Sequence, residues 1–116
     1  MGFQYSCYTL TNASNGFHHD ECVTMGAHAV YVESIEEQNF LTNTLSPATG
    51  GDELYLGYKK INNILYLAGT LTLSPFTYFG PWEGTKTNEE CVILRKTGWI
   101  DHLCGRNTKT ICEIEL

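Results

Sequence analysis

Positive charge is scarce in this sequence. The 116 residues include 7 Lys and Arg against 13 Asp and Glu, so the formal net charge is −6. A phosphate backbone or an anionic membrane surface would on balance repel such a chain. We therefore expect neither a nucleic-acid partner nor direct contact with a membrane.

Long apolar runs and zinc-type cysteine pairs are also lacking. No apolar stretch approaches the roughly 18 residues of a membrane-spanning helix, and AHAVYV, among the longest, has the length of a strand. No CxxC pair is present, which leaves a zinc ribbon with almost no support. No signal-peptide pattern follows Met1. Since five cysteines are typical of an oxidising compartment, we expect a secreted or extracellular protein with a leader or a longer chain before Met1.

The composition is otherwise that of a globular domain. Hydrophobic residues make up 42% of the chain and charged residues 17%. A chain of this length can bury about two-thirds of the surface that it exposes when unfolded. We predict a single domain over residues 1–116, with a long irregular loop at about 70–90.

Local patterns predict two helices and several strands. A short helix is expected from Phe17 to Gly26. Ser34 and Glu37 form a capping box that opens a second helix, whose apolar face would include Ile35, Phe40, Leu41 and Leu45. Strands are predicted at 4–11, 27–33, 53–58, 64–69, 91–95, 98–104 and 108–116. This order indicates an α+β fold with antiparallel sheets.

The cysteine spacing favours one arrangement of disulfides. Cys91 and Cys104 flank a short segment that contains Gly98, as expected for a hairpin closure. Cys22 and Cys112 would then link the two ends of the chain, and Cys7 is left over. Closing so long a loop stabilises a fold by about 4–5 kcal/mol in the chain-entropy picture.

The long loop contains the best candidate binding patch. The run PFTYFGPW, from Pro75 to Trp82, is rich in aromatic residues, which can stack on sugar faces or fill pockets on a protein partner. The alternative is a small loop core that shields the sheet. The candidate ligand-binding residues are Phe76, Tyr78, Phe79, Trp82, Glu83, Thr85, Lys86 and Asn88.

Several segments together resemble the C-type lectin-like domain, from Cys7 to Glu113. CVTMGAHAVYVESIEEQNFL is similar to the helix–strand–helix stretch of that family, and ELYLGYKK stands where the family has a W-I-G-L strand. EECV, GWIDHLC and TICE match the closing E-D-C-V, W-N-D and C-E pattern in order. Three aromatic residues, Tyr55, Tyr66 and Phe79, replace expected tryptophans, whereas Trp99 is expected in the core.

The resemblance implies the same disulfides that spacing favours, Cys22–Cys112 and Cys91–Cys104. Cys7 corresponds to the second cysteine of an N-terminal pair in longer members, so it would be free, separated from its partner, or bonded between chains in a homodimer.

The resemblance also implies a calcium site, which this sequence has altered. In sugar-binding members one calcium bridges protein and sugar through an E-P-N or Q-P-D triplet, a later glutamate and the W-N-D pair. Here the triplet reads Glu83-Gly84-Thr85, Glu89 is the later glutamate, and Ile100 replaces the asparagine before Asp101. Calcium prefers six to eight oxygen ligands, so these losses predict a degenerate site. Either a weakened calcium site remains, or Glu83, Glu89 and Asp101 are solvated surface carboxylates.

Other candidate sites carry weaker signals. Glu33, Glu37 and Glu113 match an auxiliary calcium position in some family members. Asn12 begins an N-glycosylation sequon. His18 and His19 precede Cys22, but adjacent helical residues point in different directions, so a surface helix face is the better interpretation than a metal site or a nucleophile.

The resemblance therefore implies an extracellular, non-catalytic recognition module that requires no cofactor. We expect a protein or cell-surface ligand bound through the long loop. The alternative is a calcium-dependent carbohydrate-binding lectin with a divergent sugar preference.

Overall fold

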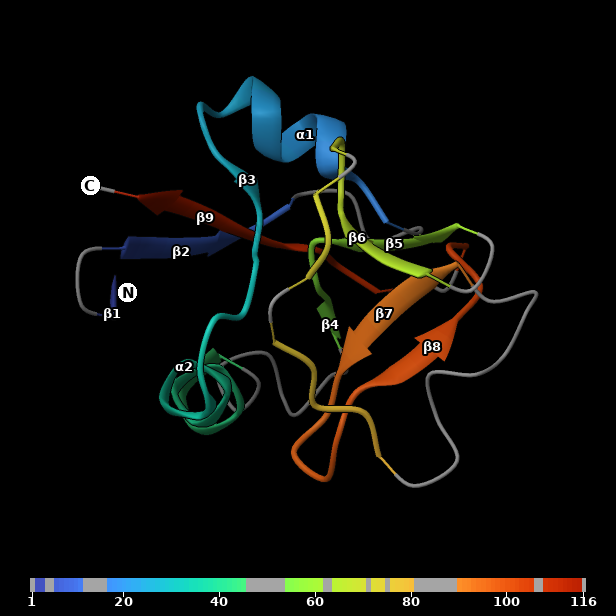
Figure 1. Cartoon of the computed structure of the whole chain (residues 1–116). Coiled ribbons are helices and arrows are strands. Elements are labelled where there is room, and N and C mark those ends of the chain that lie inside the picture. Colours follow the sequence, from blue (N-terminus) through green and yellow to red (C-terminus); the bar gives the residue numbers. More distant parts are fainter. Residues whose placement is uncertain are drawn as a thin grey trace.

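The computed structural model of the chain describes residues 2–3, 6–11, 17–45, 54–61, 64–70, 72–74, 76–80, 90–105 and 108–115. Their elements form an α+β fold of helices and antiparallel sheets, which confirms the predicted fold class (Figure 1). Helix α1 spans His19–Thr24, and α2 spans Ile35–Phe40 and continues as a π-helical turn over Leu41–Leu45. The strands are β1 Gly2–Phe3, β2 Ser6–Leu10, β3 His28–Ala29, β4 Leu54–Tyr55, β5 Tyr58–Ile61, β6 Ile64–Leu67, β7 Cys91–Leu94, β8 Ile100–His102 and β9 Ile111–Glu115.

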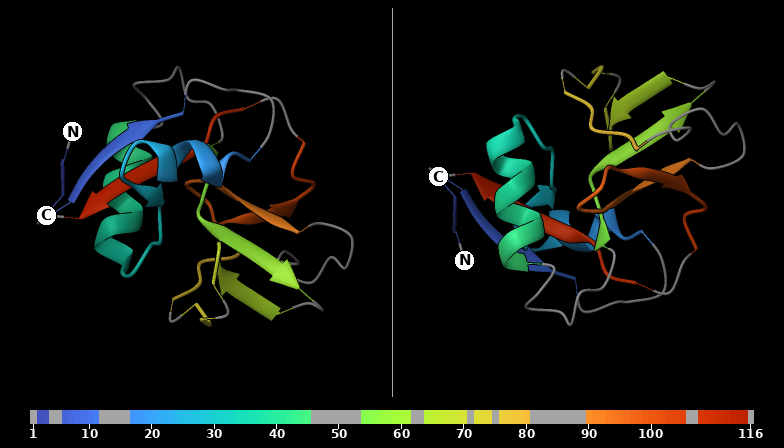
Figure 2. Two further views of the ribbon diagram at one scale, coloured as in Figure 1. Left: turned by 90° about the horizontal axis from the view of Figure 1, so that it is seen from above. Right: turned by 90° about the horizontal axis from the view of Figure 1, so that it is seen from below.

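The strands form three antiparallel sheets. Their orders are β1-β2-β9-β3, β4-β7-β8 and β5-β6. A parallel bridge between Tyr55 and Thr110 joins the first two sheets. Because β2 and β9 are neighbours, the two ends of the chain lie on one side, away from β5 to β8 (Figures 1 and 2).

Both predicted disulfides are present. Cys22 on α1 is bonded to Cys112 on β9, with 5.3 Å between the Cα atoms. Cys91 at the start of β7 is bonded to Cys104, just after β8, with 5.2 Å between the Cα atoms. The second bond therefore closes the β7–β8 hairpin, as the short spacing predicted.

Helix α2 begins at the predicted cap, and the predicted face is confirmed at Phe40, Leu41 and Leu45 but not at Ile35. The Ser34 Oγ atom accepts a hydrogen bond from the Glu37 N–H at 3.2 Å. The Glu37 Oε1 atom accepts from the Glu33 N–H instead of the cap residue's own N–H. The prediction that Ile35 faces the core is wrong, because its side chain is 38% exposed while Glu37 and Gln38 are buried. Hydrogen bonds to distant groups, described below, explain this burial of polar residues.

The cap can be tested by replacing Ser34 with alanine. Removing its hydroxyl leaves the Glu37 N–H without this acceptor, so we expect the free energy of unfolding to fall by about 1 kcal/mol. Denaturation by urea measures the change, and Ser34→Asp, which restores an acceptor, should recover most of it. Equal stability of the alanine variant and the original protein would contradict a stabilising cap.

Two predicted strands are shorter than expected because their backbone groups form hydrogen bonds outside the strand pairing of the sheets. The predicted strand 27–33 is a strand only at His28–Ala29. Beyond it, the Val30 carbonyl accepts from Gly57 N–H, and Val32 N–H donates to the Tyr58 hydroxyl at 2.7 Å. The predicted strand 53–58 likewise breaks at Gly57, where a Cβ would lie 2.3 Å from the Ala29 carbonyl oxygen.

The main core lies between α2 and the sheets. It contains twelve buried side chains: Tyr8, Val30, Val32, Leu41, Leu45, Leu54, Leu56, Tyr58, Val92, Leu94, Trp99 and Ile111. Tyr55, which replaces an expected tryptophan, is fully buried in a second cluster and donates its hydroxyl to the Leu103 carbonyl at 2.7 Å. None of the helices among the described residues is long and apolar enough to cross a membrane.

Candidate functional site

Asp101, which belongs to the predicted calcium–sugar site and lies among the described residues, forms a buried ion pair with Lys60. Asp101 lies on β8, and Lys60 reaches it from β5. The Lys60 Nζ atom is 2.7 Å from the Asp101 Oδ2 atom, and the two side chains are 4% and 0% exposed. At this distance and burial the ammonium compensates the carboxylate charge directly.

The ion pair corrects one of the two interpretations of Asp101. The hypothesis that Asp101 is a solvated surface carboxylate is wrong, because its side chain is fully buried. Sequence reasoning missed Lys60, although a signal was available. Alternate residues of a strand share a face, so Lys60 lies on the same face of β5 as the buried Tyr58.

The described residues do not fit a calcium ion at this position. An ion bound to Asp101 would meet the positive charge of Lys60, and the neighbouring Ile100 side chain offers no oxygen. Within the ranges that the structure describes, no group of three or more His, Cys, Asp or Glu side chains is placed to hold a metal.

The remaining residues of the predicted loop site cannot be placed. Trp82, Glu83, Thr85, Lys86, Asn88 and Glu89 lie outside the described residues, and so does the sequon residue Asn12. Their proposed roles stay predictions.

Three aromatic residues of the loop cover Trp99. Phe76, Tyr78 and Phe79 are half-buried and pack against the main core. The ring centroids of Phe76 and Phe79 lie 5.9 and 5.7 Å from that of Trp99, in edge-to-face geometry. The described part of the loop therefore matches the alternative of a small loop core, while a contact of these residues with ligand stays a prediction.

Backbone hydrogen bonds hold this aromatic segment against the β7–β8 turn. Trp99 N–H donates to the Tyr78 carbonyl at 2.6 Å, and Gly80 N–H donates to the Trp99 carbonyl at 3.1 Å. The two segments approach so closely that a Cβ on Gly98 would lie 2.5 Å from the Gly80 nitrogen. Gly98 also has a φ of 129°, which favours glycine.

Trp99 connects the loop to α2. Its side chain is fully buried, which confirms the prediction of a core residue. The Trp99 Nε1–H donates to the Gln38 Oε1 atom at 2.7 Å, and the Gln38 amide donates to the Arg95 carbonyl at 3.0 Å. These bonds account for the burial of a polar residue on α2.

An exposed apolar ridge runs beside the loop. Ile61 and Ile64 are directly paired across β5 and β6, and Leu73 bridges Tyr66. Since directly paired residues share a face, and so do alternate residues of β6, all four side chains lie on one face. Ile61, Ile64 and Leu73 are 48%, 45% and 60% exposed. We call Ile61, Ile64, Tyr66 and Leu73 the hairpin ridge. The sequence did not predict the ridge, because its pattern was interpreted only as strands of the fold.

Of the three glutamates predicted for the auxiliary calcium site, only two are buried. The Glu37 Oε2 atom accepts from the Tyr8 hydroxyl at 2.5 Å, and the Glu113 Oε2 atom accepts from the Ser6 hydroxyl at 2.8 Å. Burial, followed by the hydrogen bond to Glu37, raises the pKa of the Tyr8 hydroxyl well above its usual range. Glu37 and Glu113 are buried, but Glu33 is exposed. The auxiliary calcium site stays a prediction.

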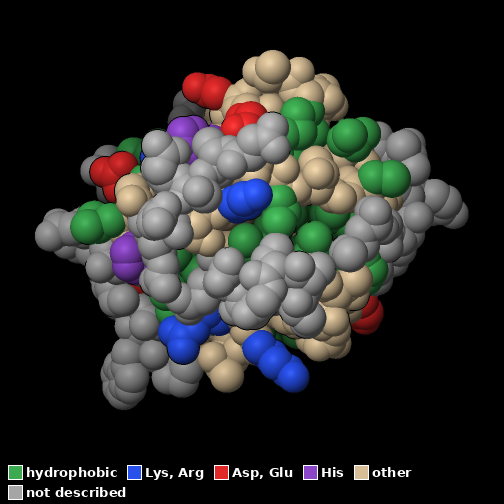
Figure 3. Space-filling view, turned by 180° about the vertical axis from the view of Figure 1, so that it is seen from behind, with side chains coloured by type: hydrophobic (Ala, Val, Ile, Leu, Met, Phe, Trp, Pro, Cys, Tyr) green, Lys and Arg blue, Asp and Glu red, His purple; other side chains and the backbone are tan. Residues whose placement is uncertain are grey.

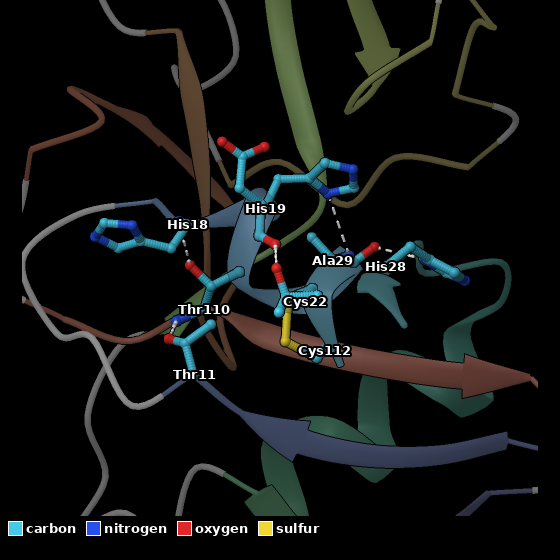
Figure 4. The surroundings of a disulfide bond; sticks show 10 residues. Thr11, His18, His19, Cys22, His28, Ala29, Thr110 and Cys112 are labelled. Atoms are coloured by element: carbon cyan, nitrogen blue, oxygen red, sulfur yellow. Dashed lines mark hydrogen bonds between the residues drawn. A yellow bond between two sulfur atoms is a disulfide. The ribbon is translucent and has the colours of Figure 1, made fainter. Parts of the chain in front are cut away.

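The histidines near Cys22 and Cys112 have structural contacts (Figure 4). His18 N–H donates to the Thr110 hydroxyl, and the Ala29 N–H donates to the His19 Nδ1 atom at 3.3 Å. Burial lowers the pKa of His19, with a smaller opposing effect of Asp20. His19 is therefore half-buried against β3, which corrects the prediction of a surface helix face. His28 stacks on Tyr31 with 4.3 Å between ring centroids.

Cys7 has a free thiol and is exposed on β2. A bond from this thiol to a second copy of the chain stays a prediction.

Comparison with known proteins places these features in a family. The family model described as "Lectin C-type domain" matches residues 6–114. CD209 antigen-like protein A of Mus musculus is 31% identical over 115 residues, which cover 96% of this chain and 48% of that protein. C-type lectin domain family 6 member A of Mus musculus is 28% identical over 123 residues, which cover 97% of this chain and 57% of that protein. The chain thus spans about half the length of these two relatives.

A solved structure agrees over the full chain. The C-type lectin domain of murine dendritic cell inhibitory receptor 2, in complex with N-glycan, covers 100% of this chain with a TM-score of 0.80 at 25% identity, and 95% of that structure is matched. The α+β architecture and two disulfides are those that the sequence resemblance implied, for an extracellular and non-catalytic recognition module. The chain belongs to the family of C-type lectin domains.

Proposed function

We propose that this domain recognises a protein or another cell-surface ligand through its long-loop region, without a calcium ion that bridges protein and sugar. The buried pair of Lys60 and Asp101 carries this proposal. Asp101 stands in the place of a calcium ligand, yet its charge is already compensated by an ammonium group from the same chain.

The energetics favour the ion pair over a bound ion. The two buried charges attract strongly because little water screens them. A calcium ion at Asp101 would have to displace Lys60 or lie beside its positive charge, and either change costs energy that an open carboxylate site would not require. This arrangement supports recognition that does not depend on calcium.

The ligand-facing surface would combine the long loop with the hairpin ridge. Leu73 belongs to both the ridge and the loop, and its 60% exposure leaves apolar area open to a partner. Hydrophobic side chains also reach the surface elsewhere, and several gather on the face seen from behind (Figure 3). Apolar anchors of this kind contribute much of the affinity of protein interfaces.

Glycan binding is the second candidate function. The solved relative in complex with N-glycan covers the whole of this chain at 25% identity, which supports glycan binding as a candidate. A divergent calcium site built from Glu83, Glu89 and Asp101 would then select a different sugar.

Binding of the fluorescently labelled domain to cultured cells tests the proposal. We expect binding to persist in EGTA and to disappear after the cells are treated with protease. Leu73→Asp should weaken binding by about tenfold, because it places a charge within an apolar contact. Val23→Asp on α1 is the matched control, since Val23 is 55% exposed and lies outside the ridge; it should change binding by less than about twofold.

A glycan array in calcium and in EGTA separates the two candidates. Binding to defined glycans that is lost in EGTA and in Glu83→Ala would overturn the proposal in favour of a calcium-dependent lectin. Unchanged binding of Leu73→Asp to cells would instead remove the hairpin ridge from the ligand face.

A further inference from the structure

A lysine lies beside one of the two disulfides. Lys59, on β5, places its Nζ atom 3.5 Å from the Cys104 Sγ atom and 3.9 Å from the Cys91 Sγ atom. The Lys59 side chain is half-buried and its Nζ atom lies 5.9 Å from the centre of the Phe17 ring. This partial burial holds a positive charge against both sulfur atoms of the bond.

The same disulfide is open to solvent at one end. Cys104 is half-buried, whereas Cys91 is fully buried. The flanking Leu103 is 56% exposed, and a Cβ built on Gly105 would meet no atom within 4 Å. The two cysteines of the other disulfide, Cys22 and Cys112, are both fully buried. Cys104 is therefore the most exposed of the four disulfide-bonded cysteines.

We propose that Cys91–Cys104 is a site of thiol–disulfide exchange with small thiols such as glutathione. The attacking thiolate forms a bond to the Cys104 sulfur, and the bond between the two cysteines breaks. The electron pair of that bond leaves with Cys91 as a thiolate, next to the Lys59 ammonium. A second thiol then releases the adduct from Cys104 as a mixed disulfide of two small thiols, which leaves both cysteines reduced.

Lys59 assists the exchange in two ways. A thiolate leaves more readily when a nearby positive charge stabilises it, because exchange is faster for leaving groups that are weaker bases. The same charge attracts the incoming thiolate to an otherwise acidic protein. Among the described residues, the side chains packed around Cys22–Cys112 are the apolar ones of Phe17, Ala27 and Ala29.

Exchange at this site would loosen the β7–β8 hairpin. Cys91 pairs with His102, the residue next to Asp101, and the disulfide joins the two strands at this end of the hairpin. The inference does not rest on the proposed function, because it concerns the sulfur chemistry and not the ligand.

Differential alkylation tests the proposal. The free Cys7 is first blocked with iodoacetamide, the protein is exposed to glutathione at pH 7.4, and new thiols are labelled and located by peptide mass spectrometry. We expect Cys104 to carry the glutathione adduct and Cys91–Cys104 to open at least about tenfold faster than Cys22–Cys112. Equal opening rates of the two disulfides would overturn the proposal.

Variants of Lys59 separate its charge from its packing. Lys59→Gln should slow the opening of Cys91–Cys104 by about tenfold, whereas Lys59→Arg should keep most of the rate. Lys96→Gln, which removes an exposed positive charge from the opposite end of the hairpin, should change the rate by less than about twofold. If Lys59 acted only through packing, its loss would loosen the hairpin and speed the reaction, so an unchanged or faster rate in Lys59→Gln contradicts the proposal.

Discussion

Replacing Lys60 with methionine is expected to lower the free energy of unfolding by about 3–5 kcal/mol. The substitution keeps the length of the side chain but leaves the Asp101 carboxylate buried without the ammonium that lies 2.7 Å away. Such a loss is a large part of the roughly 5–15 kcal/mol that stabilises a typical domain. Chemical denaturation followed by tryptophan fluorescence measures the change.

Two further variants show whether the effect comes from the uncompensated charge. Lys96→Met removes an exposed lysine and should change stability by less than about 0.5 kcal/mol. The double variant Lys60→Met/Asp101→Leu removes both charges and should recover most of the stability, since apolar residues often replace a buried ion pair at little cost. Equal losses in the single and double variants would show that packing, and not charge, is responsible.

Calcium provides a second measurement on the same variant. In the original protein the Asp101 charge is already compensated, so calcium added at Asp101 should not raise the melting temperature. Lys60→Met removes the ammonium that opposes a cation at Asp101, so millimolar calcium should restore part of the lost stability. If calcium stabilised the original protein and Asp101→Asn abolished that stabilisation, the role assigned to Lys60 would be contradicted.

Replacing Trp99 with alanine is expected to have the second large effect on the free energy of unfolding. The side chain is fully buried and contacts Tyr58 as well as the loop residues Phe76 and Phe79. Removing it from the core should lower the free energy of unfolding by about 3–5 kcal/mol. Denaturation followed by circular dichroism measures this change, since the substitution removes one of the two tryptophans that report by fluorescence.

Trp99→Phe separates the hydrogen bond from the packing. It keeps an aromatic ring in the core but removes the N–H that donates to Gln38, so about 1–3 kcal/mol should be lost. We also expect proteolysis within residues 76–80 to become faster in Trp99→Ala, because the half-buried aromatic residues lose the surface on which they pack. An unchanged cleavage rate would contradict the function of Trp99 as the anchor of this segment.

The parts of the fold that sequence predicted are those with local causes. The cap at Ser34 depends on groups three residues apart, and the disulfide of Cys91 and Cys104 closes a short hairpin. Strands β7, β8 and β9 lie within the predicted segments because their apolar residues and flanking turns are contiguous in the chain. Such signals do not require knowledge of the tertiary neighbours.

The parts that sequence missed depend on distant partners. Ile35 is exposed and Gln38 is buried instead, where its side-chain oxygen accepts a hydrogen bond from the N–H of Trp99, 61 residues away. Asp101 was given as a metal ligand or a surface carboxylate because its true partner lies 41 residues earlier on another sheet. The alternation along β5 places Lys60 on the same face as Tyr58, but it does not identify Asp101 on another sheet as its partner.

The antiparallel pairing of β2 with β9 has a mechanical consequence. Tension applied at the two ends of the chain would first separate β1 from β2. It would then pull Ser6 and Glu115 apart, and the following pairs would open one after another toward Cys112. At Cys112 the covalent bond to Cys22 takes up the force, so residues between these cysteines are shielded from it. The hairpin that carries Asp101 would stay folded under a pull that strips the terminal strands.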